Sequence, residues 1–103
     1  MLISVIIPTY NRSKFLTKTI NSLINQNTNI KYEIIIIDDG STDDTKKVVL
    51  NIRNSKIKYF YQKNKERGAA RNYGLEKAIG EYVNFFDSDD IAYPDHLQTA
   101  SDI

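Results

Sequence analysis

Three aspartates within four residues, Asp87, Asp89 and Asp90, form the sharpest chemical signal in this chain of 103 residues. Carboxylates this close repel one another, which raises their proton affinity unless a cation lies between them. Hard divalent ions such as Mg²⁺ take oxygen ligands, often one or two carboxylates together with substrate phosphates. A solvated acidic turn is the simpler alternative. The position after an apolar run, opposite a second acidic pair, favours a metal site at this segment.

The second acidic pair, Asp38 and Asp39, also follows an apolar run and precedes Gly40, Ser41 and Thr42. Asp, Gly and Ser are common in turns and helix caps, and that structural role is the expectation for Ser41 and Thr42. For the two aspartates we expect a division, in which one faces the ligand-binding edge of the sheet and the other turns into the fold.

Polar residues follow the first apolar run as well, in the segment Pro8, Thr9, Tyr10 and Asn11. Pro8 has a structural explanation as a strand terminator, and Asn11 has one as a helix cap. Thr9 and Tyr10 have no such structural requirement, which makes them candidates for ligand contact.

Residues 67–74, with the sequence RGAARNYG, place small residues at the predicted start of a helix. Small side chains there let a ligand approach backbone N–H groups, whose dipole favours anions. Packing against a sheet would explain the glycines and alanines equally well, but it would not explain Arg71. The planar guanidinium of Arg71 could reach a phosphate or a base carbonyl.

These clusters follow four apolar runs that we predict to be strands, over residues 3–7, 33–37, 57–61 and 82–86. Apolar residues at steps of three and four predict helices over residues 13–26 and 45–52. A third helix is predicted over residues 69–79, between Gly68 and Gly80, because glycine suits the left-handed cap. Strands that alternate with helices indicate crossover connections and a Rossmann-like, mostly parallel α/β sheet. Ligands bind beyond the carboxyl ends of such strands, so all the clusters should meet at one edge.

Three details refine this prediction. The third run is interrupted by Lys58 and is expected near an edge of the sheet. Asp43 and Asp44 are expected in the first turn of the second helix, where negative charge is favourable. Pro94 suits the first turn of a fourth helix.

Composition excludes several functions. Fourteen basic and 13 acidic residues give a net charge of +1, so no broad field favours nucleic acid. The absence of cysteine excludes a disulfide framework and a zinc–thiolate site. The apolar residues 1–7 are too short to span a bilayer and have no basic leader, so we expect neither a membrane segment nor a signal peptide. No G-x-G-x-x-G or P-loop motif and no Ser/His/Asp set is present.

Four segments, residues 4–11, 37–43, 68–74 and 86–90, resemble the family 2 glycosyltransferases of the GT-A fold. The resemblance covers nearly the whole chain, and four motifs in the right order make it specific. It implies a nucleotide-diphosphate-sugar donor, with uridine as the family default, and transfer to an acceptor hydroxyl with inversion. It also implies a Mn²⁺ or Mg²⁺ cofactor and a role in polysaccharide biosynthesis.

The positions included in the nucleotide-sugar site are Pro8, Thr9, Tyr10, Asp39, Arg71 and Asp87. By resemblance, Thr9 and Asp39 match positions that hold the uracil, and Arg71 matches a position beside the base and phosphates. Asp87 matches the ribose contact. The metal ligand matches Asp89.

Asp90 extends the aspartate motif, so either Asp89 or Asp90 could be the metal ligand. Inversion requires a carboxylate that deprotonates the acceptor, and we find no candidate for this base in the chain. Family members continue into an acceptor-binding half, so we expect the base beyond Ile103. Residues 1–103 are thus expected to be the nucleotide-sugar-binding part of a GT-A domain, inactive alone and prone to self-association.

Two other functions remain open. One is a non-catalytic nucleotide-binding module with the same site. The other is a sugar nucleotidyltransferase, which shares the layered fold but normally opens with a glycine-rich loop that residues 8–11 do not provide. The expected partners are a nucleotide-sugar donor and a glycan, lipid-linked or other hydroxyl acceptor. The expected location is the cytoplasm, either free or peripheral to the membrane in the full-length protein.

Overall fold

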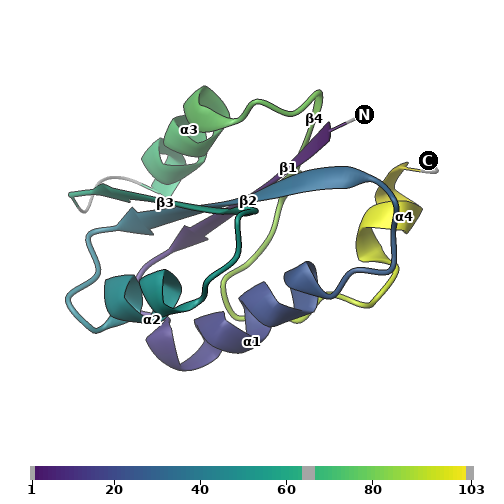
Figure 1. Ribbon diagram of the computed structural model, residues 1–103. Helices are drawn as coiled ribbons and strands as arrows, with labels where there is room; N and C mark the ends of the chain where they lie inside the picture. The colour runs from purple at the N-terminus through teal and green to yellow at the C-terminus, as the bar shows by residue number, and fades with distance from the viewer. Residues whose placement is uncertain (1, 64–66, 102–103) are drawn as a thin grey trace.

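The computed structural model describes residues 2–63 and 67–101, which form one sheet covered by helices on both faces (Figure 1). In chain order the elements are β1 (Leu2–Thr9), α1 (Ser13–Ile24), β2 (Lys31–Asp39), α2 (Thr45–Asn51), β3 (Ile57–Gln62), α3 (Arg67–Lys77), β4 (Tyr82–Phe85) and α4 (His96–Ser101). All strand pairs are parallel, in the order β3-β2-β1-β4. The predicted α/β class and parallel sheet are confirmed, and β3 lies at an edge as its interrupted pattern indicated.

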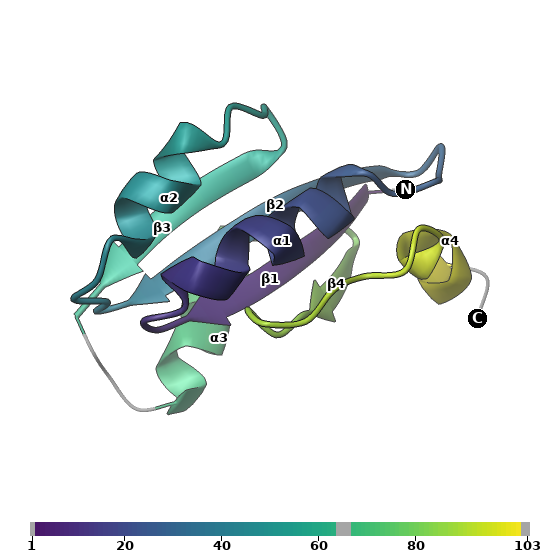
Figure 2. The ribbon, with the colours of Figure 1, turned by 90° about the horizontal axis from the view of Figure 1, so that it is seen from below.

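The sheet has a separate apolar core on each face. Figure 2 shows α1 lying across β1 and β2, with α2 beside β3. On this face, alternate strand residues such as Val5 and Ile36 pack with Leu16 and Ile20 of α1. On the opposite face, the intervening residues pack beneath α3, and Ile6 is fully buried there. Burial on both faces explains why the central strands are apolar at nearly every position.

Helix boundaries differ from the prediction where side chains hold the preceding loop. Asp43 and Asp44 precede α2 and do not lie in its first turn. The Asp43 carboxylate accepts backbone N–H groups of Thr45 and Ser13, so it ties together the starts of α2 and α1. Pro94 also precedes its helix, because its carbonyl accepts the N–H of Asn27 at 2.5 Å and holds it in the loop before α4.

Pro8 does not terminate the first strand, since β1 continues to Thr9. The reason is that the backbone nitrogen of Pro8 faces the β4 edge of β1. The carbonyl of Ile6 accepts the N–H of Phe86, so the polar groups of Ile6 and Pro8 point toward β4. Because β4 ends at Phe85, the missing N–H of Pro8 removes no ladder bond.

A buried polar network lies at the opposite end of the sheet from the acidic clusters. Glu33 is 4% exposed, and its carboxylate accepts hydrogen bonds from the Ser4 hydroxyl at 2.6 Å and the Ile79 N–H at 2.9 Å. Lys58 forms an ion pair with it at 2.7 Å. Burial by itself raises the pKa of Glu33, but the hydrogen bonds from Ile79, Lys58 and Ser4 outweigh burial and hold the pKa below its ordinary value.

Replacing Glu33 is expected to destabilise the fold without touching the predicted ligand site. Glu33→Ala should lower the free energy of unfolding by about 2 kcal/mol, because the Ile79 N–H and the Ser4 hydroxyl lose a buried acceptor. Urea denaturation measures this loss. Glu76→Ala, an exposed glutamate on α3, is the control and should change stability by less than about 0.5 kcal/mol.

The same network predicts a dependence on acid. Since the pKa of Glu33 is lowered on folding, its stabilisation is complete above the ordinary pKa of 4.5 and is lost as the pH falls through the folded-state value. The unmutated chain should therefore lose more stability below pH 4.5 than Glu33→Ala does. Equal losses in both proteins would contradict this role.

Candidate functional site

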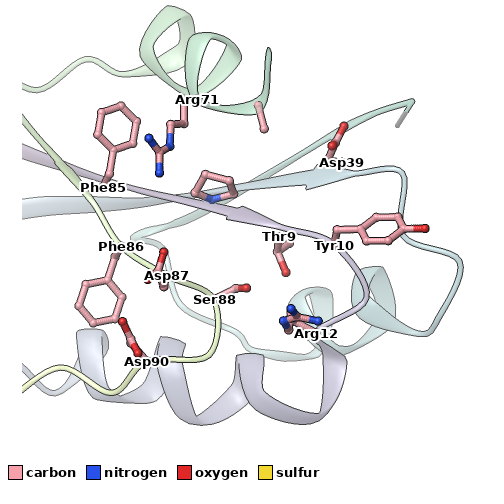
Figure 3. Close-up of a pocket in the computed structure, with 12 residues that line it drawn as sticks. Thr9, Tyr10, Arg12, Asp39, Arg71, Phe85, Phe86, Asp87, Ser88 and Asp90 are labelled. Carbon is pink, nitrogen blue, oxygen red and sulfur yellow. The ribbon is translucent and has the colours of Figure 1, made fainter. Parts of the chain in front are cut away.

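The predicted site residues meet at the carboxyl ends of β1, β2 and β4, where they line a pocket of about 710 Å³ (Figure 3). Its lining includes all six predicted nucleotide-sugar residues, namely Pro8, Thr9, Tyr10, Asp39, Arg71 and Asp87. Asp90 of the predicted metal pair also lines the pocket, whereas Asp89 is exposed and is not among the lining residues. The parallel sheet thus brings together segments that are up to 82 positions apart (8 to 90) in the sequence.

The adjacent aspartates at the end of β2 divide as predicted. Asp38 is 1% exposed and accepts hydrogen bonds from the Tyr59 hydroxyl at 2.5 Å and the Ser41 N–H at 2.9 Å. Burial and the bond to Asp38 raise the pKa of Tyr59, which therefore stays a neutral donor. Asp39 lies on the opposite face of the strand and lines the pocket.

Asn11 does not cap α1. Its backbone is in the left-handed region, with φ 51°, a conformation that asparagine tolerates better than most residues. The Asn11 side-chain oxygen accepts the N–H groups of Thr42 and Asp43, and its own N–H donates to the Ser41 hydroxyl at 2.9 Å. Asn11 therefore joins the loop after β1 to the loop after β2, which fixes Tyr10 relative to Asp39.

Helix α3 places Arg71 over the pocket. The guanidinium carbon lies 5.5 Å from the centre of the Phe85 ring, on the same side of β1 as Asp39 (Figure 3). Ala70 is buried, and a Cβ added at Gly74 would overlap the side chain of Ile6. These small residues bring α3 close to the sheet, so the packing explanation holds for them.

Thr9 lies on the other side of β1 from the Asp39 and Arg71 side chains. It is 3% exposed, and its hydroxyl is the one buried side-chain polar atom without a hydrogen-bond partner in residues 2–63 and 67–101. Figure 3 shows this hydroxyl directed toward Ser88 and Arg12. A base in contact with Asp39 would therefore meet the main chain of Thr9 more readily than its hydroxyl.

The aspartate segment after β4 is held against α1. Ser88 is buried, and its carbonyl accepts a hydrogen bond from the Thr19 hydroxyl at 3.0 Å. The N–H of Asp90 approaches the carbonyl of Asp87 at 3.2 Å, which turns the segment and brings both side chains to the pocket. Within the described part of the chain, no three His, Cys, Asp or Glu side chains are grouped closely enough to hold a metal ion by themselves.

Sequence reasoning missed several residues that also line the pocket, namely Arg12, Ala70, Phe85, Phe86 and Ser88. Phe85 and Phe86 had a readable signal, because they end the apolar run directly before Asp87. Arg12 had none, because its placement depends on the loop conformation that Asn11 imposes.

Three comparisons with known proteins agree on one family. A model described as glycosyl transferase family 2 matches residues 4–100. An uncharacterized glycosyltransferase of Rickettsia conorii is 48% identical over 97 residues, which cover 93% of this chain and 16% of that protein. A Campylobacter jejuni protein named GalNAc(5)-diNAcBac-PP-undecaprenol beta-1,3-glucosyltransferase is 47% identical over 92 residues, covering 85% of this chain and 29% of that protein.

Solved structures show the same arrangement. S. aureus TarS in complex with UDP-GlcNAc superposes with a TM-score of 0.91 at 39% identity, over 99% of this chain and 30% of that one. The mannosyltransferase PcManGT of Pyrobaculum calidifontis, in complex with GDP-Man and Mn²⁺, gives 0.82 at 25% identity, over 95% of this chain and 30% of that one. The GT-A likeness of the fold is thereby confirmed.

The chain spans between 14% and 40% of the length of similar curated relatives. None of the helices in the described ranges 2–63 and 67–101 has the length and apolar character needed to cross a membrane.

Proposed function

Because the chain belongs to glycosyl transferase family 2, we propose that residues 1–103 are the donor-binding part of an inverting glycosyltransferase that uses a UDP-sugar. The observation that carries this proposal is the pocket that joins Asp39, Arg71 and Asp87 at the carboxyl ends of the strands. TarS, whose fold this chain shares, has been crystallised with UDP and with UDP-GlcNAc, which supports uridine as the base.

We assign the donor contacts from the two sides of the pocket. Asp39, at the end of β2, is assigned as the acceptor for the uracil N3–H, and Arg71, which lies over the Phe85 ring, is assigned as a cation for the base carbonyl or the phosphates. Pro8 and Tyr10, at the end of β1, line the same pocket, and Asp87 is assigned to the ribose hydroxyls. Pocket walls of this kind hold the donor in one orientation, which lowers the entropic part of the barrier.

We propose that a divalent ion binds at the aspartate segment after β4 and shares its coordination with the donor, since Asp87 and Asp90 line the pocket. Mg²⁺ and Mn²⁺ sites commonly use one or two protein carboxylates, with substrate phosphates as further ligands. We assign the protein ligands to Asp89 and Asp90, which follow Asp87 in the turn after β4. When bound, the ion would offset the negative charge that develops on the departing diphosphate. PcManGT, a neighbour in structure, was solved with Mn²⁺.

The reaction itself needs an acceptor hydroxyl that attacks the anomeric carbon from the face opposite the diphosphate. A new carbon–oxygen bond forms as the sugar–phosphate bond breaks, and a carboxylate takes the hydroxyl proton. The aspartates of this pocket are assigned to the donor, so we place this base in the acceptor-binding half of the full-length enzyme. For the acceptor we propose a glycan or a lipid-linked sugar, as in the name of the Campylobacter relative. A lipid-linked acceptor would place the whole enzyme at the cytoplasmic side of a membrane.

A non-catalytic nucleotide-binding module is the alternative from another class. It would bind UDP equally well, so binding alone does not separate the two. Acceptor-dependent release of UDP by the full-length protein would establish the enzyme, whereas UDP binding without turnover would favour the module. A sugar nucleotidyltransferase is less well supported, because residues 8–11 form no glycine-rich loop after β1.

The 103-residue chain alone is expected to bind UDP without transferring sugar and to associate with itself. Tyr82 and Phe85 of β4, together with Ile91 and Tyr93 beyond it, are exposed apolar side chains, and such surfaces promote association. Light scattering should detect dimers or larger species, and a coupled assay should detect no acceptor-dependent UDP release. A monodisperse monomer that transfers sugar to an added acceptor would overturn both expectations.

A further inference from the structure

Gln62, the last residue of β3, makes a hydrogen bond to the base-contacting aspartate of the proposed site. Asp39 and Gln62 are register partners in the parallel pair β2–β3, so their side chains project from the same face. The side-chain Nε2 of Gln62 donates to Oδ1 of Asp39 at 2.9 Å. Hydrogen bonds to an ionised acceptor are about twice as strong as those between neutral groups.

Gln62 reaches Asp39 from outside the nucleotide pocket. Asp39 lines the pocket of about 710 Å³, whereas Gln62 lines a separate groove of about 600 Å³ between the end of β3 and the α3 residues Asn72, Tyr73 and Glu76. Gln62 is not among the residues that line the nucleotide pocket. The contact that links Gln62 to the nucleotide pocket in the described structure is its bond to Asp39.

The hydrogen bond from Gln62 can restrict the orientation of the Asp39 carboxylate. The terminal torsion of an aspartate is broad, so a half-buried carboxylate samples several orientations unless a neighbour restrains it. A bond to Oδ1 restrains this rotation. The amide N–H also leaves Asp39 as an acceptor, which is what a uracil N3–H requires and what the unprotonated N3 of cytosine does not match.

We propose that Gln62 is a positioning residue for base selection, which orients the Asp39 carboxylate toward the N3–H of uracil. This inference rests on the proposed function, since it assumes a uridine nucleotide in the pocket. Gln62 itself does not line the nucleotide pocket.

The test is calorimetric binding of UDP and CDP, with Mn²⁺ present, to the 103-residue chain and its variants. Gln62→Leu removes the donor, and we expect UDP to bind about tenfold more weakly while CDP changes little. Gln62→Glu keeps the shape but places a second carboxylate against Asp39, so the loss for UDP should be larger. Tyr61→Phe, an exposed neighbour on the opposite face of β3, is the matched control and should leave both affinities unchanged.

A double-mutant cycle separates positioning from a structural role. In the Asp39→Ala background, Gln62→Leu should change UDP affinity by less than about twofold, because the contact that links Gln62 to the pocket has been removed. An equal loss of UDP and CDP affinity, or the same loss in the Asp39→Ala background, would overturn the inference. If Gln62→Leu binds UDP as tightly as the unmutated chain does, the role of Gln62 is refuted and the proposed function is not. No UDP binding by the unmutated chain would refute the proposed function as well.

Discussion

UDP is expected to bind the chain measurably only when Mn²⁺ or Mg²⁺ is present, with an affinity at least about tenfold lower in EDTA, or ~1.4 kcal/mol. The reason is electrostatic. Asp87 and Asp90 face the same pocket as the proposed diphosphate, and carboxylates repel phosphates unless a cation lies between them. Isothermal titration calorimetry in Mn²⁺ and in EDTA measures the difference.

Asp89→Ala is expected to abolish the metal dependence of UDP binding while the thermal unfolding midpoint stays unchanged, since Asp89 is an exposed side chain. Asp90→Ala tests the other candidate ligand, which lines the pocket. Asp95→Ala, an exposed aspartate in the next loop, is the control and should retain full metal dependence. Equal UDP affinity in Mn²⁺ and EDTA for the unmutated chain would rule out the metal site.

UDP is also expected to out-compete CDP by about tenfold or more, a difference of roughly 1–3 kcal/mol. Asp39 is the assigned acceptor for the uracil N3–H, and cytosine has no hydrogen at that position. A site built around this bond loses it when CDP enters. Competition calorimetry with both nucleotides measures the ratio.

Asp39→Ala should reduce the UDP-to-CDP ratio to about one without unfolding the chain. Asp38→Asn is the matched control on the neighbouring residue. Asp38 is buried and holds Tyr59 and Ser41, so its replacement should lower stability by about 1–3 kcal/mol and leave the nucleotide ratio intact. Indistinguishable UDP and CDP affinities for the unmutated chain would exclude the role given to Asp39.

The sequence by itself determined the elements and the edge at which the site forms. The strands are mostly apolar runs, with Lys58 interrupting β3, and α1 and α2 have an apolar three-to-four residue repeat. Both are local patterns that burial enforces. Alternation of strands and helices then required a parallel sheet. The carboxyl ends of β1, β2 and β4 therefore had to carry residues 8–11, Asp39 and Asp87 to one place.

The family resemblance supplied what these local patterns could not, namely the hypothesis that the ligand is a sugar nucleotide. Asp38 and Asp39 illustrate the boundary between the two kinds of inference. Alternation along a strand predicted that one carboxylate is buried and the other faces the pocket. No pattern within the chain identifies the ligand of the carboxylate that faces the pocket, and its contact with a base remains a proposal.

Only the tertiary structure decided the contacts between segments. Asn11 bonds residues about 30 positions away, and Gln62 bonds Asp39 across 23 positions. Such bonds depend on strand register and loop conformation, which no local periodicity specifies. The structure also directed the Thr9 hydroxyl away from Asp39 and left Asp89 outside the pocket lining. The order of residues in the sequence determines which of them lie at the carboxyl ends of the strands. The conformation of the backbone determines the face of the sheet from which each side chain projects.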